Sequence, residues 1–197
     1  MDEFLLIFIQ EFLRNDYLTP FMVFITHTGD YGLLFIAVTA VLMLIPRIRR
    51  LGHVIGCSLG IEFIINNVIL KNLVARTRPY IVIEELEILI GEQLDYSFPS
   101  GHSGVAFAFA AAMLFSYIHG IEGFSKNRSF QIATLLVLLY ASILAFSRLY
   151  VGVHYPSDVF AGMLLGLITG DLGYLAEKKI FNFWSRKQPV KIPADNK

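Results

Sequence analysis

Three groups of polar side chains stand at the ends of long apolar stretches of this chain, and their residue types suit phosphate chemistry. The groups are Lys71, Arg78 and Pro79; Pro99, Ser100, Gly101 and His102; and Ser147, Arg148, His154 and Asp158. Charged side chains are costly to hold near hydrocarbon, so polar groups in such surroundings usually mark a functional site. Together they offer fixed cations, two imidazoles and a carboxylate, which can bind a phosphate and attack it.

The first group supplies positive charge. Lys71 and Arg78 lie seven residues apart, about two helical turns, so one helix face can present both. The planar fork of Arg78 can hold two phosphate oxygens, while Lys71 is a point charge. Pro79 cannot continue the helix and directs the chain away. The alternative is that Lys71, Arg76 and Arg78 only reach toward the membrane boundary.

The second group lies where a loop enters an apolar stretch. Ser100 can be the N-cap of a helix, and Gly101 lets a ligand approach the backbone closely. A helix N-terminus presents free N–H groups and a partial positive charge, which favour anions. His102 then lies in the first turn, within reach of a departing oxygen. The alternative is an ordinary helix cap.

The third group pairs a histidine with a carboxylate. Arg148 ends one apolar stretch and His154 precedes the next, with Asp158 four residues later. A carboxylate that accepts from one ring nitrogen fixes the tautomer and raises the basicity of the other nitrogen. His154 prepared in this way is a competent nucleophile at neutral pH. The alternative is a structural hydrogen bond or a helix cap.

Together the three groups resemble the signature of the type 2 phosphatidic acid phosphatase family, which is related to the vanadium haloperoxidases. The family pattern is Lys-x6-Arg-Pro, then Pro-Ser-Gly-His, then Ser-Arg-x5-His-x3-Asp. All eleven specified positions match between residues 71 and 158. The resemblance implies a helical membrane core and phosphate release without a metal ion or other cofactor.

The resemblance also implies a role for each position. The residues that would bind the phosphate are Lys71, Arg78, Ser100, Gly101 and Arg148. His154 would attack phosphorus to form a phosphohistidine, and Asp158 would orient it. His102 would protonate the departing oxygen, after which water releases inorganic phosphate.

The composition indicates one membrane-embedded domain over 1–197. Hydrophobic residues make up 55% and charged residues 16%, against about 25% charged in an average soluble domain, and the mean hydropathy is +0.61. A helix needs about 20 apolar residues to cross the hydrocarbon. Five segments qualify: 30–46, 52–74, 101–119, 130–147 and 158–180. We expect an all-α bundle of about five transmembrane helices, with its core at 30–180 and a basic cytoplasmic tail at 181–197.

The first 29 residues fit a crossing less well. Segment 4–12 is apolar but short, and polar residues 14–16 interrupt it before the apolar segment 21–25. We expect two amphipathic helices in the outer interface, with a sixth, broken span as the alternative. The run from Thr26 to Asp30 is interpreted as a helix boundary with capping side chains.

Charge placement predicts the sidedness. If the five spans alternate, basic residues outside the polar groups share one side: Arg47, Arg49, Arg50, Lys126, Arg128 and the tail. The positive-inside rule makes that side cytoplasmic. The other side carries the acids Glu84, Glu85, Glu87, Glu92 and Asp95. We therefore expect a multi-pass protein of a bacterial plasma membrane, with the polar groups at the extracytoplasmic face and the C-terminus in the cytoplasm.

Further polar residues lie within the spans or beside the site. Glu62, Asn66, Asn67 and Asp171 are expected to pair between helices, with the lining of a polar cavity as the alternative. Segment 80–98 is long for a connection, and we expect a short interfacial helix in it that flanks the entry of a lipid tail.

The leading hypothesis is a lipid phosphatase that removes a phosphate or diphosphate head group. Undecaprenyl diphosphate is the favoured substrate, with phosphatidylglycerophosphate or phosphatidic acid as alternatives. The expected partners are this lipid and the bilayer. The net charge of zero argues against a nucleic acid, and the oligomeric state stays open. An anion-binding transporter is the alternative from another class, although it would not need two histidines and Asp158. Peroxidase chemistry with bound vanadate is less consistent with five spans.

Overall fold

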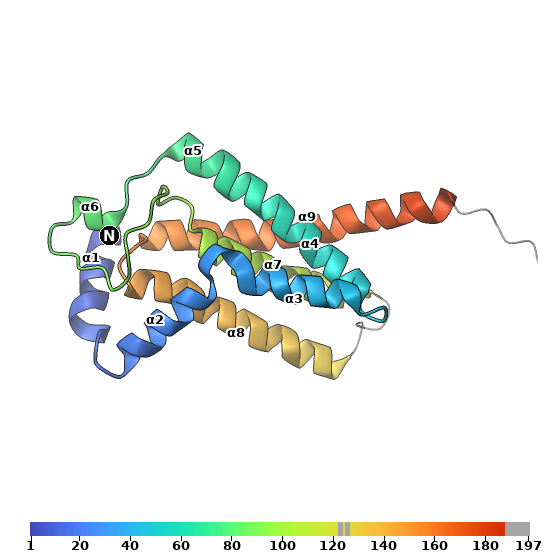
Figure 1. Ribbon diagram of the computed structural model, residues 1–197, viewed down its shortest axis with the longest axis horizontal. Helices are drawn as coiled ribbons and strands as arrows, with labels where there is room; N and C mark the ends of the chain where they lie inside the picture. The colour runs from blue at the N-terminus through green and yellow to red at the C-terminus, as the bar shows by residue number, and fades with distance from the viewer. Residues whose placement is uncertain (122–123, 125–126, 188–197) are drawn as a thin grey trace, which may run out of the picture.

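Long apolar segments of this chain form helices because only intrahelical hydrogen bonds satisfy the backbone in hydrocarbon. The computed structural model describes residues 1–121, 124 and 127–187, and all regular structure there is helical (Figure 1). The elements are α1 (Asp2–Phe8), η1 (Ile9–Leu13), α2 (Leu18–Thr28), η2 (Asp30–Gly32), α3 (Leu33–Leu44), α4 (Arg49–Phe63), η3 (Ile64–Leu70), α5 (Lys71–Val74), α6 (Pro79–Val82), α7 (Gly101–Ile118), α8 (Arg128–Tyr150) and α9 (Pro156–Lys187). Here η1 and η3 are π-helical and η2 is a 3-10 turn.

The described residues contain up to five helices that are long and apolar enough to cross a membrane, as expected. Four are single segments, namely Arg49–Val82, Gly101–Ile118, Arg128–Tyr150 and Pro156–Phe183. The fifth is a pair, α2 with η2 and α3, bent by 44°. Consecutive crossings run in opposite directions, so their ends gather at two sides of the bundle (Figure 1).

The bent pair corrects the expected start of the first crossing. The expected span at 30–46 contains η2 and the twelve residues of α3, which are too few to cross alone. Together with the preceding α2, these elements form a bent pair that is long and apolar enough for one crossing. The two are separated where Tyr31 and Gly32 adopt left-handed conformations, with φ of 53° and 65°. Of the two interfacial helices expected in 1–29, only α1 with η1 stays outside a crossing.

The centre of the bundle is α7, and its small side chains let neighbouring helices come close. Ala106, Ala108 and Ala110 are fully buried. A Cβ atom added to Gly166 of α9 would lie 2.5 Å from the Gly104 carbonyl oxygen. Helix α9 therefore packs with its backbone directly against α7.

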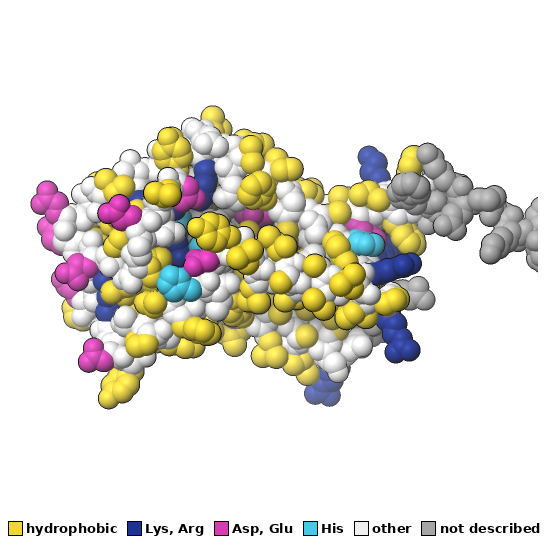
Figure 2. All heavy atoms as spheres, viewed as in Figure 1, with side chains coloured by type: hydrophobic (Ala, Val, Ile, Leu, Met, Phe, Trp, Pro, Cys, Tyr) yellow, Lys and Arg dark blue, Asp and Glu magenta, His cyan; other side chains and the backbone are white. Residues whose placement is uncertain are grey.

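The two ends of the bundle carry different charges. Figure 2 shows acidic side chains gathered at the left end, basic ones at the right end, and hydrophobic ones between them. Helix α4 begins at the right end with Arg49, two residues after Arg47 (Figure 1). Helix α9 continues to Lys187, seven residues beyond the expected span. Lys126 and the final residues 188–197, with Lys191, lie outside the described residues, as do the side chains of Arg186 and Lys187.

Segment 80–98 does not form the expected interfacial helix. Only residues 80–82, in α6, are helical, and the rest of the segment runs irregularly across the left end in Figure 1. Ile83 and Leu86 are buried in a small cluster with Leu6 and Tyr155. Ile83 and Leu86 therefore pack onto α1 and the start of α9. The side chains of Ile81, Val82 and Leu94 are exposed, so the apolar side chains do not form one stripe.

Adding a methyl group to Gly166 is expected to destabilise the protein by about 1–3 kcal/mol, because the new Cβ overlaps the α7 backbone. The matched control is Gly60→Ala in α4, where a Cβ atom meets nothing within 4 Å. That variant should be as stable as the parent or slightly more stable. Thermal unfolding of both variants in detergent checks this, and equal midpoints would contradict the close packing of α7 and α9.

Candidate active site

The three polar groups meet at the acidic end of the bundle. Lys71 and Arg78 come from the end of the second crossing, Ser100 to His102 from the start of α7, and Arg148 to Asp158 from the link between α8 and α9. Two adjoining cavities of about 610 and 540 Å³ lie here. They share Asn67, Lys71, Arg78, Gln93, Leu94 and Asp95 in their linings. The second cavity is also lined by His102, Arg148 and His154.

The two cations of the first group converge in a way that differs from the expected helix face. The helix ends at Val74, and Ala75 adopts a left-handed conformation with a φ of 46°. The chain then turns back, and Pro79 begins α6 instead of ending the preceding helix. Lys71 and Arg78 thus approach each other through a turn, and both are buried.

The third cation, Arg148, is buried at the end of α8. Its guanidinium donates to Thr26 Oγ1 at 2.5 Å and to Gln93 Oε1 at 3.3 Å. Its Nε has no hydrogen-bond partner among the described residues. A buried guanidinium with a free donor fits a site that an anion completes.

Ser100 caps α7 as expected, since its Oγ accepts from the Ser103 N–H at 3.4 Å. A Cβ atom on Gly101 would lie 3.3 Å from Asn67 Oδ1 and 3.9 Å from Lys71 Nζ. The start of α7 therefore faces Lys71 across a narrow gap. An anion between them would meet the lysine charge and the free N–H groups of the helix end.

His154 is buried with its two ring nitrogens facing different partners. Its Nε2 lies 3.3 Å from a guanidinium nitrogen of Arg78. Because a guanidinium only donates, this contact requires an unprotonated Nε2 and puts the ring proton on Nδ1. Burial lowers the pKa of His154 well below its ordinary value of 6.5, and the charges of Arg78 and Arg148 add to the effect. The imidazole is therefore neutral, with its lone pair on the nitrogen beside the cations.

Asp158 lies on the Nδ1 side of His154, but the two are not hydrogen-bonded. The distance from Nδ1 to Asp158 Oδ2 is 3.6 Å, beyond hydrogen-bond range. That oxygen accepts from Ser97 Oγ at 2.5 Å and from the Tyr155 N–H at 3.0 Å. The other oxygen accepts from Arg76 at 2.5 Å. Asp158 is thus fixed beside His154, and a small ring movement would close the orienting contact.

His102 has a carboxylate partner that the motif spacing does not reveal. Its Nε2 lies 3.2 Å from Asp30 Oδ1, while Asp30 Oδ2 lies 2.8 Å from His27 Nδ1. Asp30 stands in the bend of the first crossing, which the sequence indicated only as a capped helix boundary. Two residues in left-handed conformations, Tyr31 and Gly32, follow Asp30 directly in this bend. A second histidine–carboxylate pair therefore stands near the first.

Sequence reasoning also missed the structural roles of Arg76 and Asp95. Arg76 binds Asp158 and stacks over the Tyr155 ring at 3.8 Å, so it is more than a boundary residue. Asp95, expected only as one of several outer acids, forms ion pairs with both Lys71 and Arg78. Neither contact leaves a signal in local spacing, because the partners are far apart in the sequence.

The polar residues within the spans pair in two ways. Asp171 of α9 lies 3.6 Å from His119 at the end of α7, which confirms an interhelical contact. Glu62 instead accepts from Asn66 one turn along the same helix, at 2.6 Å. Asn66 also reaches the Ser100 carbonyl oxygen at 3.5 Å. These residues support the base of the site. Among the described residues, no group of three or more His, Cys, Asp or Glu side chains is arranged to hold a metal ion.

Comparison with known proteins gives one family and several relatives. Residues 51–181 match the family model of the PAP2 superfamily. An undecaprenyl-diphosphatase of Sulfolobus acidocaldarius is 33% identical over 76% of this chain and 66% of its own length. The undecaprenyl-diphosphatase BcrC of Bacillus subtilis is 31% identical over 81% of this chain and 75% of its own length.

Two solved structures share the fold. The crystal structure of a transmembrane PAP2 type phosphatidylglycerolphosphate phosphatase from Bacillus subtilis matches with a TM-score of 0.72 and 27% identity, over 91% of this chain and 85% of that one. Aquifex aeolicus LpxE matches with a TM-score of 0.63 and 26% identity, over 82% of this chain and 87% of that one.

The low pKa of His154 predicts that the folded protein loses stability as the pH falls below about 6.5. In that range the unfolded chain binds a proton at residue 154 and the folded chain does not. Stability should therefore fall by up to about 1.4 kcal/mol per pH unit from this group, until the folded pKa is reached. Unfolding midpoints in detergent from about pH 7 to pH 4 measure this slope. The slope should be shallower in His154→Gln and unchanged in the control His53→Gln, and equal slopes in both variants would contradict a neutral buried His154.

Proposed function

The chain belongs to the PAP2 superfamily, and on that basis we propose that it is a membrane lipid phosphatase that cleaves undecaprenyl diphosphate or a similar polyprenyl diphosphate. The observation that carries this proposal is the position of His154. Its unprotonated Nε2 faces Arg78 in a cavity that also contains His102 and the other cations. A nucleophile, an acid and phosphate-binding cations thus share one space.

The first step forms a bond between His154 Nε2 and phosphorus. Lys71, Arg78 and Arg148 hold the equatorial oxygens, whose charge grows in the transition state. The bond from phosphorus to the leaving oxygen breaks, and protonated His102 gives its proton to that oxygen. For a diphosphate the product that leaves is a lipid monophosphate. A small ring movement closes the contact of 3.6 Å between Nδ1 and Asp158, which then accepts the Nδ1 proton and stabilises the positive ring.

The second step regenerates the enzyme. Water attacks the phosphohistidine, and the now neutral His102 accepts a proton from that water. The bond between phosphorus and Nε2 breaks, and inorganic phosphate leaves. Asp30 is a positioning residue in both steps, because its carboxylate holds Nε2 of His102 and favours the protonated ring. The Nδ1 atom is then the one that faces the substrate.

The cavity also has an apolar side that suits a lipid tail. Phe63 and Val105 line it between the second and third crossings, together with Gly32 at the bend of the first. The acids around the site and the basic residues at the opposite end support a location at the extracytoplasmic face, with the C-terminus in the cytoplasm (Figure 2). The substrate would then reach the site from the outer leaflet.

Replacing His154 with alanine should lower phosphate release by more than about a thousandfold, because no other group can take its place as nucleophile. Purified protein is assayed in detergent with EDTA, which we expect to leave the wild-type rate unchanged. His53 lies near the start of α4, at the end of the bundle away from the site, so the control His53→Ala should keep the wild-type rate. Full phosphate release by His154→Ala would refute this use of the site, and binding of lipid without any release by the wild type would favour a transporter.

The same assay identifies the head group. We expect the highest kcat/KM for undecaprenyl diphosphate in a panel that includes phosphatidylglycerophosphate and phosphatidic acid. The fold match to a phosphatidylglycerolphosphate phosphatase makes the second lipid the main alternative. A higher kcat/KM for that lipid would reject the diphosphate and keep the reaction class.

Asp30→Asn should lower kcat for an alkyl phosphate by at least about tenfold with little change in KM, because His102 loses the charge that favours its protonated form. An aryl phosphate with a good leaving group, such as p-nitrophenyl phosphate, needs less help from an acid and should be affected much less. Asp30→Glu should recover part of the rate. His27→Gln is the control, since His27 contacts the other oxygen of Asp30. An equal loss on both substrates would indicate a purely structural role.

A further inference from the structure

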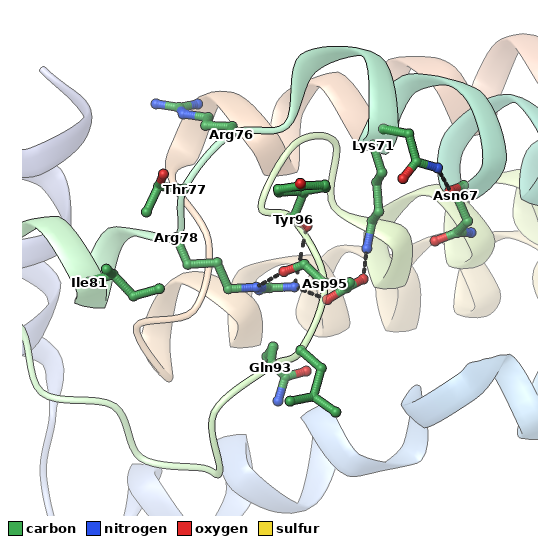
Figure 3. A pocket seen from close by; sticks show the side chains of 11 residues that line it. Asn67, Lys71, Arg76, Thr77, Arg78, Ile81, Gln93, Asp95 and Tyr96 are labelled. Atoms are coloured by element: carbon green, nitrogen blue, oxygen red, sulfur yellow. Dashed lines mark hydrogen bonds and ion pairs between the residues drawn. The ribbon is translucent and has the colours of Figure 1, made fainter.

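Asp95 occupies the two cations to which the proposed function assigns the phosphate. Its carboxylate accepts from Lys71 Nζ and, at 2.5 Å, from Arg78 Nη2. Arg78 Nε also donates to the Asp95 backbone oxygen at 2.8 Å. Figure 3 shows the carboxylate lying between the two basic side chains at the wall of the cavity. An anion from the protein itself therefore stands where phosphate oxygens would bind.

The position of Asp95 next to the nucleophile makes this occupation significant. The guanidinium that binds Asp95 also lies 3.3 Å from His154 Nε2. A phosphorus atom placed for attack by His154 would have its oxygens on the same donors. Substrate and Asp95 thus compete for Lys71 and Arg78, and the carboxylate must leave before the reaction begins.

The surroundings of Asp95 allow its carboxylate to leave Lys71 and Arg78 and to return to them. Its side chain is 52% exposed, whereas that of Arg78 is 3% exposed. The chain is fixed on both sides: Gln93 N–H donates to the Tyr80 hydroxyl at 3.1 Å, and Ser97 N–H donates to the Arg76 carbonyl at 2.9 Å. Only a short stretch between these anchors has to move. Because the tether is short, the carboxylate remains at a high effective concentration beside the cations.

The charge on Asp95 is permanent at any pH at which the protein would work. Burial alone would raise its pKa, but the hydrogen bond and charge of Lys71, with those of Arg78, outweigh burial and lower the pKa to about 2. The Asp95 carboxylate therefore competes as an anion with one full negative charge and two oxygens. A ligand can displace it only by offering Lys71 and Arg78 more negative charge or more oxygen acceptors.

Membrane lipids differ in the negative charge that their head groups offer to these cations. The head group of an ordinary phospholipid is a phosphodiester with one negative charge, which is no more than Asp95 already supplies. A terminal phosphate carries up to two charges and has three free oxygens, so it can bind all three cations. We propose that Asp95 occupies Lys71 and Arg78 until a terminal phosphate displaces it, and that this competition weakens the binding of phosphodiester lipids enough to keep those of the bilayer from blocking the site.

This inference rests on the proposed function, and its test compares substrate and competitor on the same protein. The KM for a lipid with a terminal phosphate and the inhibition constant of phosphatidylglycerol, a phosphodiester, are measured in mixed micelles. In Asp95→Asn the inhibition constant should fall at least about tenfold, because a neutral amide no longer competes with the diester, and KM should fall with it because the substrate displaces the same carboxylate. Asp95→Glu keeps the charge and should keep the wild-type inhibition constant. Glu92→Gln removes a charge from the same segment and is the matched control.

The outcomes separate the two proposals. An inhibition constant in Asp95→Asn equal to that of the wild type, or an equal fall in Glu92→Gln, would overturn the role of Asp95 while active wild-type protein still supports the phosphatase. Absence of phosphate release by the wild type would overturn the phosphatase and the role of Asp95 with it. Equilibrium binding of both lipids in a His154→Ala background repeats the comparison without turnover, and Asp95→Asn should lower the dissociation constant of the diester there by the same factor.

Discussion

The structure depends on three buried cations that must be held close together without a permanent partner. Lys71, Arg78 and Arg148 repel one another in a poorly solvated site, and such charges are costly unless an anion accompanies them. Side chains from several elements stabilise these cations, including Asp95 on the irregular segment and Thr26 on α2. Burial, together with the same positive charge, lowers the pKa of His154 and keeps its ring neutral. In the proposed mechanism, phosphate binding and activation of the nucleophile thus depend on the same cluster of cations.

The helices around α7 convert this arrangement into a fixed geometry. Small residues along α7 and glycines along α9 let the two backbones touch, and both helices begin at the site. His102 in the first turn of α7 and Asp158 in the first turn of α9 are therefore positioned by the best-packed contact in the bundle. The turn after Val74 then brings Arg78 back toward them.

The spacing of the motifs was sufficient to predict which residues gather, because few arrangements of cations, imidazoles and a carboxylate serve phosphate transfer. Hydropathy predicted the number of crossings for a similar reason, since the hydrocarbon sets the helix length. The missed features depend on the tertiary fold. Nothing local indicates that Ala75 turns the chain back, that α2 completes the first crossing, or that Asp30 and Asp95 reach their partners. Segment 80–98 was expected to form an interfacial helix, but its Ile83 and Leu86 pack against Leu6 of α1. The roles of the site residues stay predictions.

The glycines of α9 have a mechanical consequence. Gly162 and Gly166 leave no slack between α9 and α7, so this side of the catalytic centre behaves as a rigid wall. The opposite side consists of the bent pair α2–α3 and the irregular segment between α6 and α7, where bending costs much less free energy. Any adjustment to lipids of different thickness or head-group size must therefore be absorbed there. The cavity therefore has one rigid face, which fixes the geometry of the site, and one deformable face, which can adapt to different lipids.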